Sequence, residues 1–409
     1  MKLGGWDLVS VVPADRVNAA MAASGATPAE FSYTEQPLKI AGRFGPWRIV
    51  PGGSVQLLHV DLPIAEGRYT DAQGTPPSAD LAGLVLRVEL ALRLVPAPDD
   101  SGARDLVFDV VRDGLDTALP PVRALSLDGG EARLGPQASR VVMMALAACL
   151  SAHPDRIGFV FARARTTGPM EMAHHDWAWL ETTKGSHLAM LGSVAPPGPD
   201  MRPDHVDPRL LGNGQSRAFA LSDRAFFMRV LGPWMNDGFR PRGRFRASSA
   251  SVTLAAPLRL PPRKESGYVL HTVLRRLDFR RKGAGLQVSV VARTRTDGVS
   301  VILNTEMLMV MRLAFDAKAG TVILHPDPKP HARTWAEGAG LWGSLEALIA
   351  NIVLLFMQDS IAALAGSVAK SMHRMNTDDV RPVIWRGQPT FKPASALLDD
   401  CFLFAEAAD

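Results

Sequence analysis

The sequence predicts an α+β protein in which long antiparallel sheets wrap around long helices. Three observations lead to this fold class. Residues 84–95 alternate strictly, with aliphatic side chains on one face and Arg87, Glu89 and Arg93 on the other, which is the period of a half-buried strand. Glycine (35) and proline (31) are frequent among the 409 residues, which indicates many turns and many strands. Residues 341–372 form a long helical pattern that is apolar around most of its circumference.

The expected strand lengths indicate an elongated molecule. A strand over residues 84–95 would be about 40 Å long, which is about twice the usual length. Further strands are expected at residues 42–50, 55–62, 105–111, 122–127, 157–165 and 177–183, and then at 248–260, 269–280, 286–294, 300–314 and 321–325. Helices are expected at residues 14–23, at 137–152 after a proline, and from the N-cap Ser222 to about Leu231.

The element order divides the chain. Each half contains a short helix, a strand meander, a longer helix and further strands. Residues 196–214 are rich in proline and glycine and lack a periodic pattern. We therefore expect an N-terminal domain over residues 1–195, a linker or long loop over 196–216, and a C-terminal domain over 217–409 that carries the long helix, 341–372.

Composition excludes several classes of protein. The formal net charge of +4 is too small for a dedicated nucleic-acid binder, so we expect no nucleic-acid partner. Two cysteines exclude a disulfide scaffold and a cysteine zinc site. The N-terminus lacks the apolar region of a signal peptide, and no run reaches the length of a membrane span. We expect a soluble protein that is cytoplasmic, or released without a classical signal peptide.

Catalytic and metal motifs are weak. The string nearest to a nucleophile elbow surrounds Ser367 and lies inside the expected long helix, where no strand–turn–helix can form. One Glu-x-x-His pattern, Glu171 to His174, lacks the second copy and the extra carboxylates of a metal bundle. We therefore expect no catalytic residues, no metal site, no cofactor and no enzyme activity.

Arginine clusters allow two interpretations. Four arginines stand within seven residues, and a second group follows near residues 275–282. They are either solvated loops and outer strand faces, or one cationic patch that contacts anionic lipid headgroups or an acidic partner. The candidate contact residues are Arg240, Arg242, Arg244 and Arg246.

The methionines follow an unusual pattern along the sequence. Three methionines alternate on one expected strand, and others lie on the expected helices. Methionine suits both an irregular core and an adaptable apolar groove, and both interpretations stay open. The candidate groove residues are Leu348, Ile352, Leu355, Phe356, Met357, Met144, Met307, Met309 and Met311.

Short N-terminal motifs carry a family resemblance. They are Gly5-Trp6-Asp7-Leu8-Val9, Arg16-Val17-Asn18, the run from Gly42 to Ile49, Gly52-Gly53-Ser54 and Val60-Asp61-Leu62-Pro63-Ile64, together with the later block Ala220-Leu221-Ser222, Phe226-Phe227, Leu231 and Pro233. The chain resembles the accessory lipid-binding proteins of some clostridial neurotoxin gene clusters, which belong to the tubular lipid-binding (TULIP) superfamily together with bactericidal/permeability-increasing protein. The resemblance implies two TULIP-like domains, a lipid-holding apolar groove, no catalytic residues, and partner proteins from the same gene cluster.

Two functions follow from these expectations. The first is non-enzymatic binding of a lipid or another acyl-chain ligand in an apolar groove, with peripheral contact to an anionic membrane surface. The alternative is a structural or interaction subunit of a toxin-like complex, whose core is closed and filled by its own side chains.

The expected long helix generates a direct prediction. Ile352→Asp would place an unpaired charge on a buried helix, which costs several kcal/mol. We expect insoluble or unfolded protein, measured by expression yield and thermal melting. A variant that folds with the wild-type melting temperature would mean that this helix is exposed.

Overall fold

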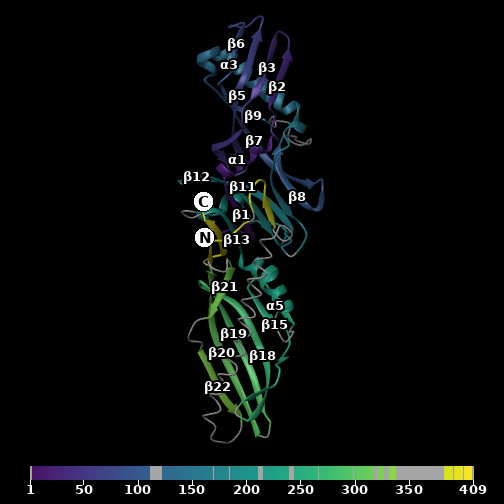
Figure 1. Ribbon diagram of the computed structural model, residues 1–409, viewed down its shortest axis with the longest axis vertical. Coiled ribbons are helices and arrows are strands. Elements are labelled where there is room, and N and C mark those ends of the chain that lie inside the picture. Colours follow the sequence, from purple (N-terminus) through teal and green to yellow (C-terminus); the bar gives the residue numbers. More distant parts are fainter. Residues whose placement is uncertain are drawn as a thin grey trace.

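The computed structural model describes residues 2–110, 122–168, 170–183, 185–210, 215–238, 244–265, 267–297, 299–316, 321–326, 331–337, 382–389, 391–398 and 400–407. Three antiparallel sheets follow one another along an elongated molecule (Figure 1). We call them the upper, central and lower sheets, in their order from top to bottom in Figure 1. The expected antiparallel, strand-rich architecture is therefore confirmed.

The upper sheet has the strand order β2-β3-β5-β7-β8-β10-β23, with β4 and β6 paired to β5 and β9 paired to β7. These strands are β2 (Glu30–Glu35), β3 (Leu38–Phe44), β4 (Arg48–Ser54), β5 (Leu57–Asp71), β6 (Ser78–Asp80), β7 (Val85–Ala97), β8 (Asp100–Asp109), β9 (Arg123–Asp128), β10 (Val160–Arg165) and β23 (Val383–Trp385). The alternation predicted for residues 84–95 is confirmed, because Leu86, Val88, Leu90 and Leu92 of β7 are buried.

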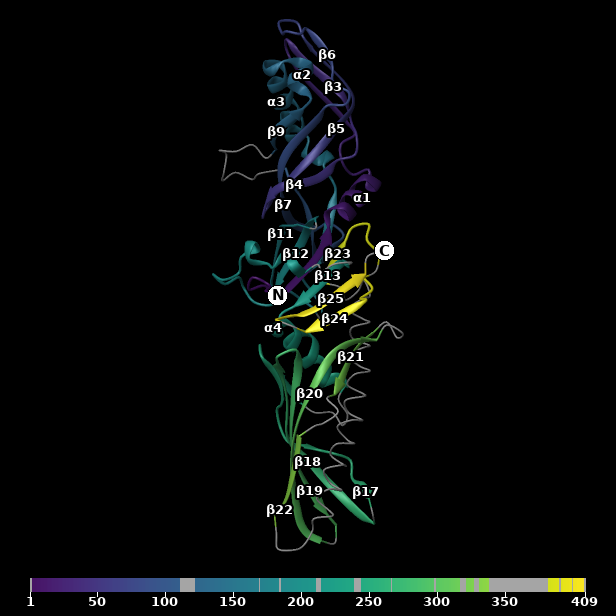
Figure 2. The ribbon, with the colours of Figure 1, turned by 90° about the vertical axis from the view of Figure 1, so that its left-hand side faces the viewer.

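The central sheet joins the two ends of the chain. Its order is β11-β12-β1-β13-β25-β24 (Figure 2). Only β13 therefore separates β1, the first strand of the chain, from β25, the last one. Its strands are β1 (Leu8–Pro13), β11 (His174–Thr182), β12 (Gly185–Ser193), β13 (Gln215–Leu221), β24 (Ser395–Leu398) and β25 (Phe402–Ala407). Apolar side chains cover both of its faces. Leu8 and Val12 belong to the main core, whereas Val9 and Val11 belong to a second, smaller cluster.

The lower sheet has the order β14-β15-β18-β19-β20-β21, with β16 and β17 paired to β18 and β22 paired to β20. Its strands are β14 (Phe245–Ala247), β15 (Ser251–Leu254), β16 (Leu258–Arg259), β17 (Arg263–Glu265), β18 (Tyr268–Lys282), β19 (Gly285–Thr296), β20 (Val299–Asp316), β21 (Thr321–Pro326) and β22 (His331–Glu337). Three of these strands have 12 to 18 residues, which accounts for the length of this part of the molecule.

The described helices are short. They are α1 (Ala14–Ser24), α2 (Gly130–Leu134), α3 (Pro136–Ala152), the 3-10 turns η1 (Pro154–Arg156), η2 (Pro203–His205) and η3 (Pro208–Leu210), then α4 (Asp223–Ala225), the π-helical turn η4 (Phe226–Leu231) and α5 (Gly232–Gly238). Ser222 caps α4 as predicted, accepting a hydrogen bond from the Ala225 N–H. Pro233 does not end the helical segment, because α5 follows the π-helical turn η4 without a break. None of the described helices is long and apolar enough to cross a membrane.

Several expectations need correction or lie outside the described residues. The strand expected at residues 42–50 is two strands, β3 and β4, which run in the same direction along β5 and are separated by a break at residues 45–47. Strands β2, β12 and β13 were not predicted. The long helix expected at 341–372 lies outside the described residues, so long helices inside the sheets stay a prediction.

The expected linker is attached to the start of the chain. Between β12 and β13 the chain forms η2 and η3, and Leu3 pairs with Val206 in an isolated β-bridge. The Arg202 N–H donates to the Gly4 carbonyl, and Val206 and Leu210 are buried. The domain boundaries at 195 and 217 stay a prediction.

One buried histidine of the central sheet generates a pH prediction. His175 on β11 is 5 % exposed, and burial lowers its pKa from 6.5 to about 4. The unfolded chain therefore binds a proton between about pH 6.5 and 4 that the folded chain does not, so stability falls as the pH falls through this window. Between pH 7 and 5 the wild type should lose about 2 kcal/mol more than His175→Gln. Urea unfolding at both pH values measures this difference.

His153→Gln is the matched control, because His153 is exposed at the end of α3. It should keep the wild-type pH dependence. Equal pH slopes for wild type and His175→Gln would contradict a neutral, buried His175.

Candidate functional site

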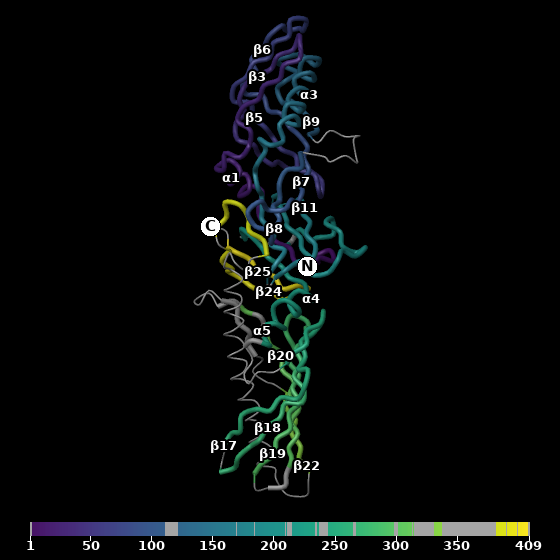
Figure 3. The backbone as a smooth tube through the Cα atoms, turned by 90° about the vertical axis from the view of Figure 1, so that its right-hand side faces the viewer, coloured from purple at the N-terminus to yellow at the C-terminus, as the bar shows by residue number. Residues whose placement is uncertain are grey.

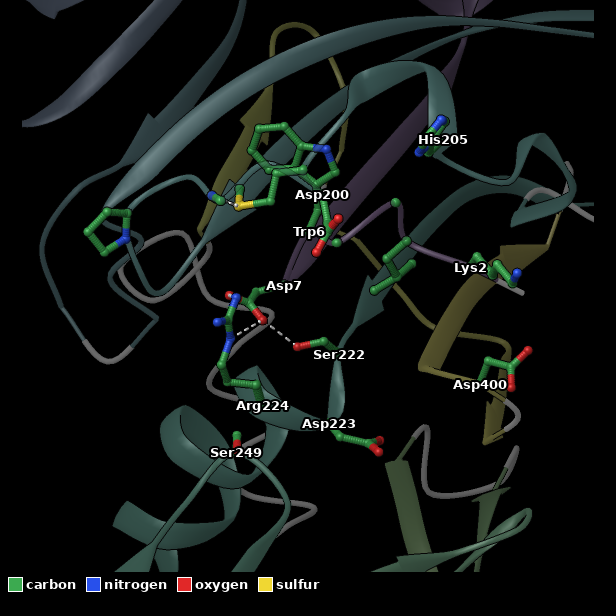
Figure 4. Close-up of a pocket in the computed structure, with 16 residues that line it drawn as sticks. Lys2, Trp6, Asp7, Asp200, His205, Ser222, Asp223, Arg224, Ser249 and Asp400 are labelled. Carbon is green, nitrogen blue, oxygen red and sulfur yellow. Dashed lines mark hydrogen bonds and ion pairs between the residues drawn. The ribbon is translucent and has the colours of Figure 1, made fainter.

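A hollow of about 1010 Å³ lies beside the start of β1, between the central sheet and α4. Figure 4 shows the side chains that surround it, and Figure 3 shows α4 directly below the central sheet. Its lining residues are Lys2, Leu3, Gly4, Gly5, Trp6, Asp7, Pro196, Gly198, Asp200, Met201, His205, Ser222, Asp223, Arg224, Ser249 and Asp400. Sequence motifs that carried the family resemblance, Gly5-Trp6-Asp7 and Ser222, therefore meet at this position.

Asp7 is the centre of a buried hydrogen-bond network. Its carboxylate is 2 % exposed and accepts from Nε and Nη2 of Arg224, at 2.8 and 2.6 Å. It also accepts from the Ser222 hydroxyl at 2.6 Å (Figure 4). The Val194 N–H at 2.9 Å and the Ser193 hydroxyl at 3.2 Å complete its set of donors. The network therefore connects the start of β1, the end of β12 and the helical segment that leads into the lower sheet.

Two glycines let the chain start approach the segment that follows β12. Gly4 and Gly5 have φ values of 59° and 82°, which side-chain-bearing residues rarely adopt. A Cβ on Gly4 would lie 2.8 Å from the Arg202 carbonyl oxygen, and one on Gly5 would lie 2.9 Å from that of Asp200. The Gly4-Gly5 pair is thus required by this close backbone contact.

The remaining charges of the hollow are mostly acidic. Arg281 Nη1 lies 3.1 Å from the Asp223 carboxylate and 2.7 Å from the Asp400 carbonyl oxygen. Burial raises the pKa of the Asp223 carboxyl above its usual value, although Arg281 acts in the opposite direction. Asp200 is exposed at the rim.

The hollow has the features of a structural joint. The Ser222 hydroxyl donates to Asp7 and accepts from the Ala225 N–H, so it serves as a helix cap. Within the described part of the chain, no group of three or more His, Cys, Asp or Glu side chains could hold a metal ion. Asn18, another residue of the sequence motifs, also has a structural role. Its side-chain amide donates to the Ile49 carbonyl and accepts from the Ile49 N–H.

The lower sheet carries the second candidate region, which we call the inner face. Alternation along β18, β19 and β20 directs one set of buried side chains to the same side: Leu270, Thr272, Leu274, Leu277, Phe279, Leu286, Val288, Val290, Ala292, Thr294, Thr296, Leu303, Thr305, Met307, Met309 and Met311. The three methionines are 0 to 3 % exposed and stand opposite Val290, Val288 and Leu286 of β19.

One end of the inner face is polar. The Thr272 and Thr294 hydroxyls are 2.9 Å apart, and those of Thr305 and Thr334 are 3.2 Å apart. The Thr296 hydroxyl is buried without a hydrogen-bond partner among the described residues. The inner face therefore changes from methionine and leucine near the central sheet to threonine at the far end.

The predicted site residues are placed differently from one another. Met307, Met309 and Met311 share the inner face, as their spacing predicted. Met144 does not join them, because it is 64 % exposed on α3, where the buried stripe runs through Val142, Ala145 and Leu146 instead. Leu348, Ile352, Leu355, Phe356 and Met357 lie outside the described residues.

The predicted arginine contacts are partly described. Arg244 and Arg246 are exposed at β14, at the edge of the lower sheet, whereas Arg240 and Arg242 lie outside the described residues. Sequence reasoning missed Arg224 and Ser193, the partners of Asp7. Arg224 could have been found from its position in the first turn after the Ser222 cap. Ser193 is the last residue of β12, a strand that was not predicted.

Comparisons with known proteins agree with the resemblance expected from the sequence. A family model described as "OrfX-like: Protein OrfX2/OrfX3/P47" matches residues 3–375. The structure of P47 from Clostridium botulinum A2 has a TM-score of 0.77 and 18 % identity, covering 100 % of this chain and 98 % of that one. P47 of Clostridium botulinum E1 has a TM-score of 0.76 and 16 % identity, covering 99 % of each chain. At these identities the likeness shows a shared fold.

Two further comparisons do not show a relationship. A structure of lipopolysaccharide binding protein covers 99 % of this chain and 100 % of its own, but with a TM-score of 0.34 and 13 % identity. No curated protein matches the chain.

The Asp7 network generates a stability prediction. Asp7→Ala removes the acceptor of four donor groups and leaves Arg224 unpaired in a partly buried position. We expect a loss of about 3 kcal/mol in the free energy of unfolding, measured by urea denaturation. Asp200→Ala, in the same hollow but exposed, should stay within about 0.5 kcal/mol of the wild type. Equal unfolding free energies for the two variants would mean that the Asp7 network does not stabilise the fold.

Proposed function

The chain belongs to the OrfX2/OrfX3/P47 family, and on that premise we propose that it is a non-enzymatic protein that binds an acyl chain along the inner face of the lower sheet. One observation carries this proposal. Three methionines alternate along β20 within a continuous apolar surface formed by three long strands. Methionine side chains are flexible and polarizable, so they adapt to chains of differing length and shape.

The length of this surface suits an extended ligand. Between Phe279 and Leu270, β18 advances nine residues, which is about 30 Å at about 3.3 Å per residue. A fatty-acyl chain is of the same order of length. Burying its methylene groups contributes about 0.8 kcal/mol each.

The threonine end supports an amphiphilic ligand. Hydroxyl groups of Thr272, Thr294, Thr305 and Thr334 gather there, and the Thr296 hydroxyl lacks a partner among the described residues. A buried hydroxyl without a partner costs free energy, and a ligand headgroup could satisfy it. We therefore propose that the acyl chain lies against the methionines and the headgroup against the threonines.

The finer fold proposal is a pair of TULIP-type domains. It is supported by the long antiparallel strands, the elongated shape in Figure 1 and the single apolar cluster that includes residues of all three sheets. We further propose a cytoplasmic location or release without a signal peptide, contact with anionic membrane, and partners encoded in the same gene cluster.

A second function is a structural or interaction subunit whose core is filled by its own side chains. The observation that favours it is the nearly complete burial of Met307, Met309 and Met311. The two functions differ in whether the purified protein carries a ligand.

Mass spectrometry of an organic extract tests the proposal. Purified wild-type protein should release lipid in an amount comparable to that of the protein. Met309→Trp should fill part of the inner face and lower the extractable lipid. The matched control is Leu308→Trp, because Leu308 is the neighbouring residue on the opposite side of β20 and should leave the lipid content unchanged.

Two results would contradict lipid binding. The first is a lipid-free wild type, which favours the side-chain-filled core. The second is equal lipid content in both tryptophan variants, with circular dichroism showing that both are folded.

A further inference from the structure

The side of the lower sheet opposite the inner face is strongly basic, and we call it the outer face. Residues paired across neighbouring strands point to the same side of the sheet, so each set of paired residues forms a row on one face. The rows of the outer face begin with Lys282 and Arg312 at one end of the sheet and finish with His271 and Glu337 at the other. β14 and β15 extend one of these rows, in which Arg246 pairs with Thr253 and Thr253 with Asp278. Figure 2 shows β18, β19, β20 and β22 in this part of the molecule.

The outer face concentrates the positive charge of the chain. It carries nine lysine or arginine side chains, because β16 adds Arg259 opposite Val273: Arg246, Arg259, Arg276, Arg280, Lys282, Arg293, Arg295, Arg312 and Arg333. It carries three acids, Asp278, Glu306 and Glu337. This one face therefore has a larger positive surplus than the formal net charge of +4 of the whole chain.

The register also joins two sequence clusters that are far apart in the chain. Arg246 comes from the predicted arginine cluster at residues 240–246. Arg276, Arg280 and Lys282 come from the second arginine group, near residues 275–282. Strand pairing places them on one surface.

Several of these arginines are held in fixed positions. Arg276 binds the buried Asp278, and Arg293 lies 2.9 Å from Glu337. The Arg333 guanidinium lies 5.6 Å from the centre of the Trp335 ring. Such preorganisation lowers the entropy lost when a partner binds.

A hollow of about 550 Å³ opens in the middle of this face. Arg276, Arg333, His331 and Glu306 surround it, and Val291 and Leu308 lie among its apolar lining residues. A side chain that projects from a partner can enter this space with its polar end near the arginines.

We propose that the outer face of the lower sheet docks a partner protein that presents an acidic surface, with one projecting side chain in the hollow between Arg276 and Arg333. Eight of the nine bases are arginine, whose planar group binds carboxylates through paired hydrogen bonds and is enriched at protein interfaces.

A protein fits this face better than a membrane surface does. None of the large exposed hydrophobic side chains of the described residues, Val141, Met144, Met228 and Leu397, lies on the outer face. Stable membrane attachment combines charge with an inserted apolar group. The exposed Glu306 carboxylate at the hollow would also be repelled by anionic headgroups, whereas a protein partner can offer it a donor. This docking face is independent of the acyl-chain proposal, because it uses the opposite side of the sheet.

Binding of a fluorescein-labelled poly-glutamate peptide, measured by fluorescence anisotropy on the full chain, tests the proposal. The variant is Arg280→Glu plus Arg333→Glu, because both side chains are exposed and neither forms an ion pair with a described residue. The control is Arg48→Glu plus Arg68→Glu, which makes the same charge change at exposed positions of β4 and β5.

We expect the wild type and the control to bind the peptide alike, and the Arg280/Arg333 variant to bind about tenfold more weakly or worse. Binding should weaken as salt rises. Vesicles of equal parts phosphatidylserine and phosphatidylcholine should bind the wild type and the Arg280/Arg333 variant alike, or neither of them.

Three results would overturn the proposal. They are no peptide binding by the wild type, an equal loss in both double variants, or vesicle binding that depends on Arg280 and Arg333 while the peptide does not bind. Arg333→Gln, a milder change at the hollow, replaces the double variant if thermal melting shows that it is not folded, and should also weaken peptide binding.

Discussion

The buried carboxylate of Asp7 is the interaction on which the arrangement of the central and lower sheets depends. It accepts hydrogen bonds from Arg224, Ser222, Ser193 and the Val194 backbone, which lie 186 to 217 residues away in sequence. A charge at 2 % exposure is stable only when its lone pairs are satisfied in this way. Because the network includes the cap of α4, it also sets where the chain leaves the central sheet and enters the lower one. Arg217 and Glu406 form a similar bidentate pair between β13 and β25, so a second buried ion pair holds the last strand in the same sheet.

Strand alternation then gives the lower sheet two chemically different sides. On β20, Met307, Met309 and Met311 are buried on one side, while Glu306 and Arg312 are exposed on the other. A shift of register by one residue would exchange the two sides and bury arginine in place of methionine. The same pairing that builds the apolar inner face therefore also assembles the basic outer face. The proposed acyl-chain site and the proposed docking face consequently lie on opposite sides of one sheet and do not share residues.

The sequence predicted best where one face of an element is buried and the other is solvated. β7 and the methionine strand β20 have this pattern, and both were found with the correct inward residues. β12 was missed because the central sheet is covered on both faces, so Leu188, Ala189, Met190 and Leu191 are all buried and show no alternation. Met144 was assigned to the wrong side for a different reason. The buried stripe of α3 runs through Val142, Ala145 and Leu146, and a helix composed mostly of small apolar residues does not mark its buried side in the sequence. The Asp7 partners and the merged arginine clusters depend on pairings across long sequence separations, which local periodicity does not contain.

Native-state hydrogen exchange in the central sheet is the most direct test of the central claim, that the Asp7 network and the Arg217–Glu406 pair join both ends of the chain into one cooperative unit. The amides of Val9 in β1, Ala220 in β13 and Leu403 in β25 are suitable probes, because these strands are neighbours in the sheet. All three amides should exchange only through global unfolding, with the same free energy and the same dependence on denaturant. Exchange of Leu403 at a much lower free energy than Val9 would contradict it, because the last strand would then open separately from the first.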